Sequence, residues 1–178
     1  MLRPNVWRTI DAMTPIAPLS LGAFFCPEII MTPRTETNMI VVHCSATPPS
    51  MDIGVAQIRR WHLERGFSDT GYHWVIRRNG TMERGRNQKL QGAHCRQVNA
   101  TSIGICMVGG TNQNGEPEDN FTVEQYSSLK TLIMGLLSEF PDVSEVCGHR
   151  DIPGVSKACP SFEVADFLTA ICPDEVGP

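Results

Sequence analysis

Met39-Ile-Val-Val-His-Cys44 is the stretch of sequence that decides the fold, because it is a short, nearly continuous apolar run. Runs rich in β-branched residues are typical of strands that are buried on both faces of a sheet. Pro48-Pro49 follow and break the pattern into a loop. We therefore expect a buried strand over residues 39–44, with the polar His43 at its end, where loops can converge on a site.

Outward from this strand, the apolar spacing alternates between helical and extended periods. The spacing over residues 53–65 predicts an amphipathic helix that Gly66 stops, with its apolar face at Val55, Ile58, Trp61 and His62. Residues 72–78 alternate as a strand. Asn79-Gly80 then predicts a tight hairpin turn, because both turn positions need positive φ, and a return strand over residues 81–84 follows.

The second half of the chain continues the alternation. Residues 103–108 predict a strand that Gly109-Gly110 ends, and residues 144–147 predict a shorter one. Thr122 and Gln125 form a capping box that opens a long helix. A last helix is expected over residues 161–170. The expected apolar face of the long helix is Val123, Tyr126, Leu129, Ile133, Leu136, Leu137 and Phe140. Interleaved strands and helices predict a single α/β domain with a central mixed β-sheet flanked by helices.

Composition narrows the class of protein. The chain has 178 residues, 41% hydrophobic and 19% charged, with a net charge of −4. These values exclude a disordered chain and a coiled coil, and they argue against wholesale nucleic-acid binding. No run of eighteen apolar residues predicts a membrane span. Seven cysteines cannot all pair internally, so we expect a reducing compartment and mostly buried thiols.

The two ends of the chain differ from the middle. Five prolines interrupt residues 1–38, which we expect to form a poorly ordered N-terminal extension or sequence upstream of a true start at Met31 or Met39. Arg3 and Arg8 precede an apolar run, but the pattern is a poor match to a secretory signal peptide. The folded domain is expected over residues 39–172, with a C-terminal tail over residues 173–178.

Three residues at or after strand ends form a candidate metal site. His43 ends the first strand, His149 follows the strand over residues 144–147, and Cys159 lies in the same irregular segment. Two imidazoles and a thiolate suit zinc and leave a fourth position open for water, as in catalytic sites. From spacing alone, structural histidines and a core cysteine remain the more common interpretation. His62 and His73 are weaker ligand candidates. Adjacent residues of a strand point to opposite faces, so His43 and Cys44 cannot form a catalytic dyad.

Five segments in order carry a family resemblance: Val42-His-Cys-Ser-Ala-Thr47, Gly71-Tyr-His-Trp-Val-Ile76, Arg78-Asn-Gly-Thr-Met-Glu-Arg-Gly-Arg86, Ser102-Ile-Gly-Ile-Cys-Met-Val-Gly-Gly110 and Lys157-Ala-Cys-Pro-Ser161. Together they resemble the type 2 N-acetylmuramoyl-L-alanine amidases, which share their fold with peptidoglycan recognition proteins. The sequence is most similar to small phage endolysins of the amidase type, over roughly residues 39–168.

The resemblance implies roles for individual residues. It places the family's zinc ligands, one Zn²⁺ per chain, on His43, His149 and Cys159. Its catalytic pair falls on Tyr72 and Lys157, which would orient water, stabilise an oxyanion or move a proton. His94 and Asn99 would line the substrate groove.

The implied reaction is hydrolysis of the amide between N-acetylmuramic acid and L-alanine in peptidoglycan. The implied location is the host cytoplasm until a holin opens the membrane, and the expected state is a monomer. The alternatives are a non-catalytic peptidoglycan-binding module and an additional regulator that binds a phage RNA polymerase.

Overall fold

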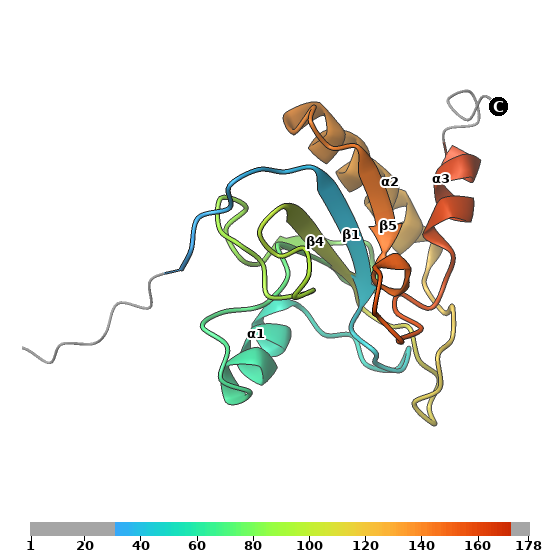
Figure 1. Ribbon diagram of the computed structural model, residues 1–178. Coiled ribbons are helices and arrows are strands. Elements are labelled where there is room, and N and C mark those ends of the chain that lie inside the picture. Colours follow the sequence, from blue (N-terminus) through green and yellow to red (C-terminus); the bar gives the residue numbers. More distant parts are fainter. Residues whose placement is uncertain (1–30, 172–178) are drawn as a thin grey trace, which may run out of the picture.

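The computed structural model describes residues 31–171 and contains one five-stranded mixed sheet with helices on both faces (Figure 1). The strand order is β3-β2-β4-β1-β5, in which only the β2–β3 pair is antiparallel. The expected α/β class and mixed sheet are confirmed. In chain order the elements are β1 (Met39–Cys44), α1 (Val55–Glu64), β2 (Trp74–Ile76), β3 (Met82–Arg84), β4 (Ser102–Met107), α2 (Val123–Glu139), β5 (Glu145–Gly148), the 3₁₀ turn η1 (His149–Asp151) and α3 (Val164–Ile171).

Strand β1 lies between two parallel neighbours, which explains its apolar sequence. Val42 is in register with Ile105 of β4 and with Gly148 of β5, so both edges of β1 are hydrogen-bonded. Ile40, Val41 and Val42 have no exposed surface because helices or loops cover both faces of the sheet. The strand predicted over residues 39–44 is therefore confirmed at both ends.

Helices α2 and α3 pack on one face of the sheet, beside β1 and β5 in Figure 1. The predicted capping box is present: Thr122 Oγ1 accepts the Gln125 N–H, and Gln125 Oε1 accepts the Thr122 N–H. The buried residues of this core are Ile40, Val42, Ile76, Ile103, Ile105, Met107, Leu129, Leu132, Ile133, Leu136, Phe162 and Val164. Val123 is a wrong prediction for this face, since its side chain is 81% exposed.

Helix α1 covers part of the opposite face. Its Ile58 packs with Val75, Cys106 and Val108. A second small cluster on this face joins Val41 and Cys147 to residues of the connecting loops. The alternation of side chains along β1 places His43 on this face with Val41, away from α2. The face that carries α1 is therefore the face on which the polar residues gather.

The remaining boundaries shift by a few residues from those expected. Strand β2 is shorter than predicted. Gly80, with φ of +80°, forms the hairpin turn into β3, but Asn79 lacks the positive φ that was expected at both turn positions. The last helix begins at Val164 rather than at Ser161, because Ser161 has a left-handed φ of +79° that no helix start accommodates.

The domain extends to residues before Met39. Arg34 N–H donates to the Lys89 carbonyl, and Asn38 N–H donates to that of Thr101. Residues 32–38, which the sequence placed in the extension, are thus tied to the loops of the domain. The signal-peptide question and the proposed tail over residues 173–178 lie outside the described residues.

Cysteines in the described part of the chain are free thiols, as expected. Cys44, Cys95, Cys106 and Cys147 are buried, whereas Cys159 is half-buried. No helix within residues 31–171 is long and apolar enough to cross a bilayer.

Candidate active site

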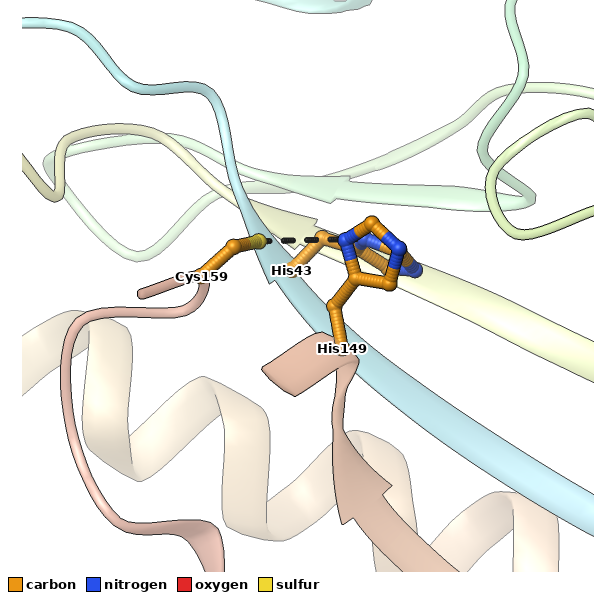
Figure 2. Close-up of side chains that lie close together, drawn as sticks. All are labelled: His43, His149 and Cys159. Carbon is orange, nitrogen blue, oxygen red and sulfur yellow. Dashed lines mark hydrogen bonds between the residues drawn. The ribbon is translucent and has the colours of Figure 1, made fainter. Parts of the chain in front are cut away.

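Three side chains from distant parts of the sequence meet at the carboxyl ends of β1 and β5 (Figure 2). His43 belongs to the end of β1, His149 opens η1 directly after β5, and Cys159 lies in the loop before α3. Their ligand atoms all lie within 4.8 Å of one another, and His43 Nδ1 is 3.8 Å from Cys159 Sγ. The three residues predicted from the sequence are therefore brought together.

The loop that carries Cys159 is fixed by backbone hydrogen bonds. Arg150 N–H donates to the Cys159 carbonyl at 2.8 Å, and Cys44 N–H donates to Cys159 Sγ at 3.2 Å. Asp151 stabilises the turn at His149, because its Oδ2 accepts the Gly148 N–H at 2.7 Å. The sulfur is thus positioned by β1 and by η1 together.

Electrostatics at the cluster favour neutral imidazoles. Burial, with smaller contributions from His94, His149 and Lys157, holds the pKa of His43 well below its usual range. Burial and Lys157 also lower the pKa of His149. Neutral imidazole is the form that binds a metal, because one ring nitrogen then offers a lone pair.

The thiol of Cys159 behaves differently. Its contact with the Cys44 thiol and its burial raise its pKa above the usual value. The Cys44 backbone N–H acts in the opposite direction, because it donates to the sulfur and favours the thiolate. A bound cation would complete the stabilisation of the charged form.

Tyr72 and Lys157 line the same cavity of about 300 Å³ as the three candidate ligands. The Tyr72 ring centroid lies 5.2 Å from that of His43. Burial raises the pKa of Tyr72 well above its usual value, and the thiols of Cys106, Cys159 and Cys44 raise it further. The phenol therefore keeps its proton at neutral pH and can act as a hydrogen-bond donor.

The two predicted groove residues occupy different places. His94 lines the cavity and lies against His43, with His94 Nδ1 3.0 Å from His43 Nε2. Asn99 supports the loop instead: its Oδ1 accepts the N–H groups of His94 and Cys95, each at 2.9 Å. A substrate contact for Asn99 stays a prediction.

The other two histidines, His62 and His73, also differ in their surroundings. His73 is buried and bonded to the backbone, since its Nδ1 accepts the Gly104 N–H and its Nε2 lies 3.0 Å from the Leu90 carbonyl. His62 lines the cavity next to Arg65 and Phe67. The sequence did not predict His62, Arg65 and Phe67 as cavity residues. Their position at the end of α1, shortly before the Gly71-Tyr72 segment, could have indicated it.

Comparisons with known proteins agree on one family. Residues 33–162 match the family described as N-acetylmuramoyl-L-alanine amidase. The chain is 45% identical over 137 residues to the endolysin of Klebsiella phage KP32, covering 77% of this chain and 89% of that protein. It is 30% identical over 157 residues to a peptidoglycan-recognition protein of Drosophila melanogaster, with 81% of each chain covered.

Among solved structures, N-acetylmuramoyl-L-alanine amidase LysC of Clostridium intestinale superposes with a TM-score of 0.66 at 29% identity. The superposition covers 76% of this chain and 85% of that one. The sheet and helices described above are therefore those of amidases and of the recognition proteins that share their fold.

Proposed function

The chain belongs to the N-acetylmuramoyl-L-alanine amidase family and is a peptidoglycan amidase, and from this premise we propose that its reaction is carried out with one zinc ion held by His43, His149 and Cys159. The bond cleaved is the amide between N-acetylmuramic acid and L-alanine. The observation that carries the zinc proposal is the convergence of two imidazoles at the ends of adjacent strands with one thiol from the loop before α3.

The donor set fits zinc in chemistry and in size. Zinc binds imidazole nitrogen at about 2.0–2.1 Å and thiolate sulfur at about 2.3 Å, so a tetrahedral site separates these two atoms by about 3.6 Å. The 3.8 Å between His43 Nδ1 and Cys159 Sγ is within a few tenths of an ångström of that value. When bound, zinc supplies a Lewis acid that activates water near neutral pH and polarises the amide carbonyl.

Tyr72 and Lys157 supply the other groups that the reaction needs. Negative charge develops on the amide oxygen during attack, and donors or cations aimed at that oxygen lower the barrier. Tyr72 carries a phenolic O–H at this cavity, so we assign it the role of hydrogen-bond donor to that oxygen. Lys157 adds positive charge at the same cavity, where it already opposes protonation of His43 and His149.

The alternative function is a non-catalytic binding module, which would bind peptidoglycan and leave it uncleaved. Loss of a metal ligand is the change that would favour it, and here His43, His149 and Cys159 are all present and lie together. Mass spectrometry of digested peptidoglycan distinguishes the two functions. Glycan strands separated from intact stem peptides support the amidase, unchanged muropeptides support the binding module, and sugar fragments would indicate a glycosidase.

Location and partners follow from the same premise. The chain is similar to phage endolysins, and we propose that it stays in the host cytoplasm as a monomer until a holin gives it access to the wall. Binding to a phage RNA polymerase stays a prediction, which a pull-down with that polymerase tests.

A further inference from the structure

Three polar side chains behind the candidate metal site form a chain of hydrogen bonds. His43 Nε2 lies 3.0 Å from His94 Nδ1, His94 Nε2 lies 3.4 Å from Ser102 Oγ, and Ser102 Oγ donates to the Val98 carbonyl at 2.6 Å. We propose that His94 and Ser102 are positioning residues that hold His43 in the tautomer whose Nδ1 lone pair faces Cys159. This inference rests on the proposed zinc site.

The direction of each bond follows from the last one. A carbonyl oxygen only accepts, so the single hydroxyl proton of Ser102 is committed to Val98. Ser102 Oγ can therefore only accept from His94, which places the His94 proton on Nε2. A neutral imidazole carries one proton, so His94 Nδ1 is an acceptor.

Because His94 Nδ1 is an acceptor, it also determines which ring nitrogen of His43 carries the proton. Its partner, His43 Nε2, must carry the proton, and the lone pair of His43 is left on Nδ1. That atom is the one 3.8 Å from Cys159 Sγ. Metal-binding histidines in proteins typically donate their second ring N–H to an acceptor that fixes ring orientation and tautomer. Here a second histidine supplies that acceptor.

The surroundings of His94 show that space is reserved for its ring. A Cβ added at Gly92 would lie 2.4 Å from His94 Cδ2, and one at Gly104 would lie 2.5 Å from the same atom. Gly104 of β4 is in register with Val41 of β1, so a side chain added at Gly104 would point to the face that carries His43. The ring therefore fits between two glycines and against the ring of His43, at a centroid distance of 5.0 Å and nearly perpendicular.

A substrate-contact role for His94 predicts different measurements. A residue that only touches the muropeptide changes KM and leaves metal affinity unaltered. A positioning residue changes the affinity of the full chain for zinc, whether or not peptidoglycan is present. Loss of an outer-shell partner typically lowers metal affinity by about 10- to 100-fold.

The test compares two variants of His94 in the full chain, with zinc affinity measured by competition against a chromogenic chelator. His94→Leu removes the acceptor, and we expect about 10- to 100-fold weaker zinc binding. His94→Asn places Oδ1 where Nδ1 was, and we expect most of the affinity to return. Equal affinities in wild type and His94→Leu would overturn the proposal, as would an equal loss in the two variants.

Serine variants and direct detection of the protons keep the test independent of how well His94→Leu folds. Ser102→Ala should weaken zinc binding, whereas Ser128→Ala should not, because Ser128 donates to the Gly80 carbonyl in the same way but contacts no histidine. Nitrogen-15 NMR of the zinc-free wild type should show both His43 and His94 protonated at Nε2. Protonation of His94 at Nδ1 would contradict the proposal even if the protein cleaved peptidoglycan normally. Failure to cleave peptidoglycan would contradict the proposed function but would not change which ring nitrogens the NMR spectrum shows to be protonated.

Discussion

The imidazole rings of His43 and His149, 106 positions apart in the sequence, have centroids 4.5 Å from each other. Parallel pairing of β1 with β5 produces this contact, because Val42 and Gly148 are in register and each histidine is the next residue. Two strands that end at the same edge of a sheet thus bring two candidate ligands together without any local sequence motif.

Removal of the sulfur ligand should separate metal binding from folding. We expect Cys159→Ala to lose its zinc and its activity while the free energy of unfolding of the zinc-free protein changes by no more than about 1–2 kcal/mol, since Cys159 is half-buried in a loop. Elemental analysis measures the zinc content, the turbidity of a cell-wall suspension measures the activity, and denaturant unfolding measures the free energy of unfolding. Cys147→Ala is the control: that thiol belongs to the cluster around Val41, and the variant should keep one zinc.

Tyr72→Phe should keep stoichiometric zinc but lose turnover. Removal of one donor to a developing oxyanion typically lowers kcat by about 100- to 1000-fold. Tyr126→Phe is the matched control, because the Tyr126 hydroxyl donates to Asp119 and does not line the catalytic cavity. Loss of metal from Tyr72→Phe would show that the phenol has a structural role instead.

Lys157→Ala should also reduce kcat with zinc retained, because the variant removes positive charge from the cavity. It should in addition raise the pKa of His149, which Lys157 now lowers, and an NMR titration of the zinc-free protein measures that change. Lys130→Ala, on the exposed side of α2, should alter neither quantity. An unchanged His149 titration would place the ammonium group away from the site.

The stability of the zinc-free protein should fall between about pH 6.5 and pH 4. Burial lowers the pKa of His73 to about 4, whereas an unfolded histidine titrates near about 6.5. Between these values the unfolded chain binds more protons, so the contribution of His73 is complete above pH 6.5 and is lost as the pH falls through 4.

The full size of this contribution is about 3–4 kcal/mol, because the two pKa values differ by about 2.5 units and each unit corresponds to about 1.4 kcal/mol. Denaturant unfolding with chelator present, at pH 7 and pH 4.5, measures it. His73→Asn should show a shallower dependence, since its Oδ1 still accepts the Gly104 N–H but does not titrate. Identical slopes for the two proteins would mean that His73 does not cause the loss.

Gly104→Ala should weaken zinc binding although it lies outside the candidate ligand set. The added Cβ would lie 2.5 Å from the His94 ring, which must move away from His43. We expect an affinity loss similar to that of His94→Leu, measured by the same competition assay. Gly135→Ala, where a Cβ meets nothing within 4 Å, should bind zinc as the wild type does.

Local patterns in the sequence predicted the elements well. The β-branched run of β1, the Asn79-Gly80 turn and the Thr122–Gln125 capping box each act over a few residues, and each is present. Val123 was wrong because it lies two residues from the buried Gln125. Two residues correspond to a rotation of about 200° on a helix, which turns Val123 toward solvent.

The site depended on information that local patterns do not contain. Spacing alone could not show that residues 43, 149 and 159 meet, because strand order decides that contact; the family resemblance did. The partnership of His94 with His43 was missed altogether. It requires Gly104 of β4 to pass beneath the ring, and no pairing rule between residues 94 and 104 reveals this arrangement.

The order in which the ligands occur along the chain has a consequence for biosynthesis. His43 is made early, whereas His149 and Cys159 follow 106 and 116 positions later, and β5 must pair with β1 before the three can meet. A nascent or prematurely terminated chain that stops before His149 carries one of the three candidate ligands and cannot assemble the site. With the proposed zinc site, hydrolytic capacity is thus gained only by chains whose translation has passed Cys159, and shorter products lack wall-degrading activity.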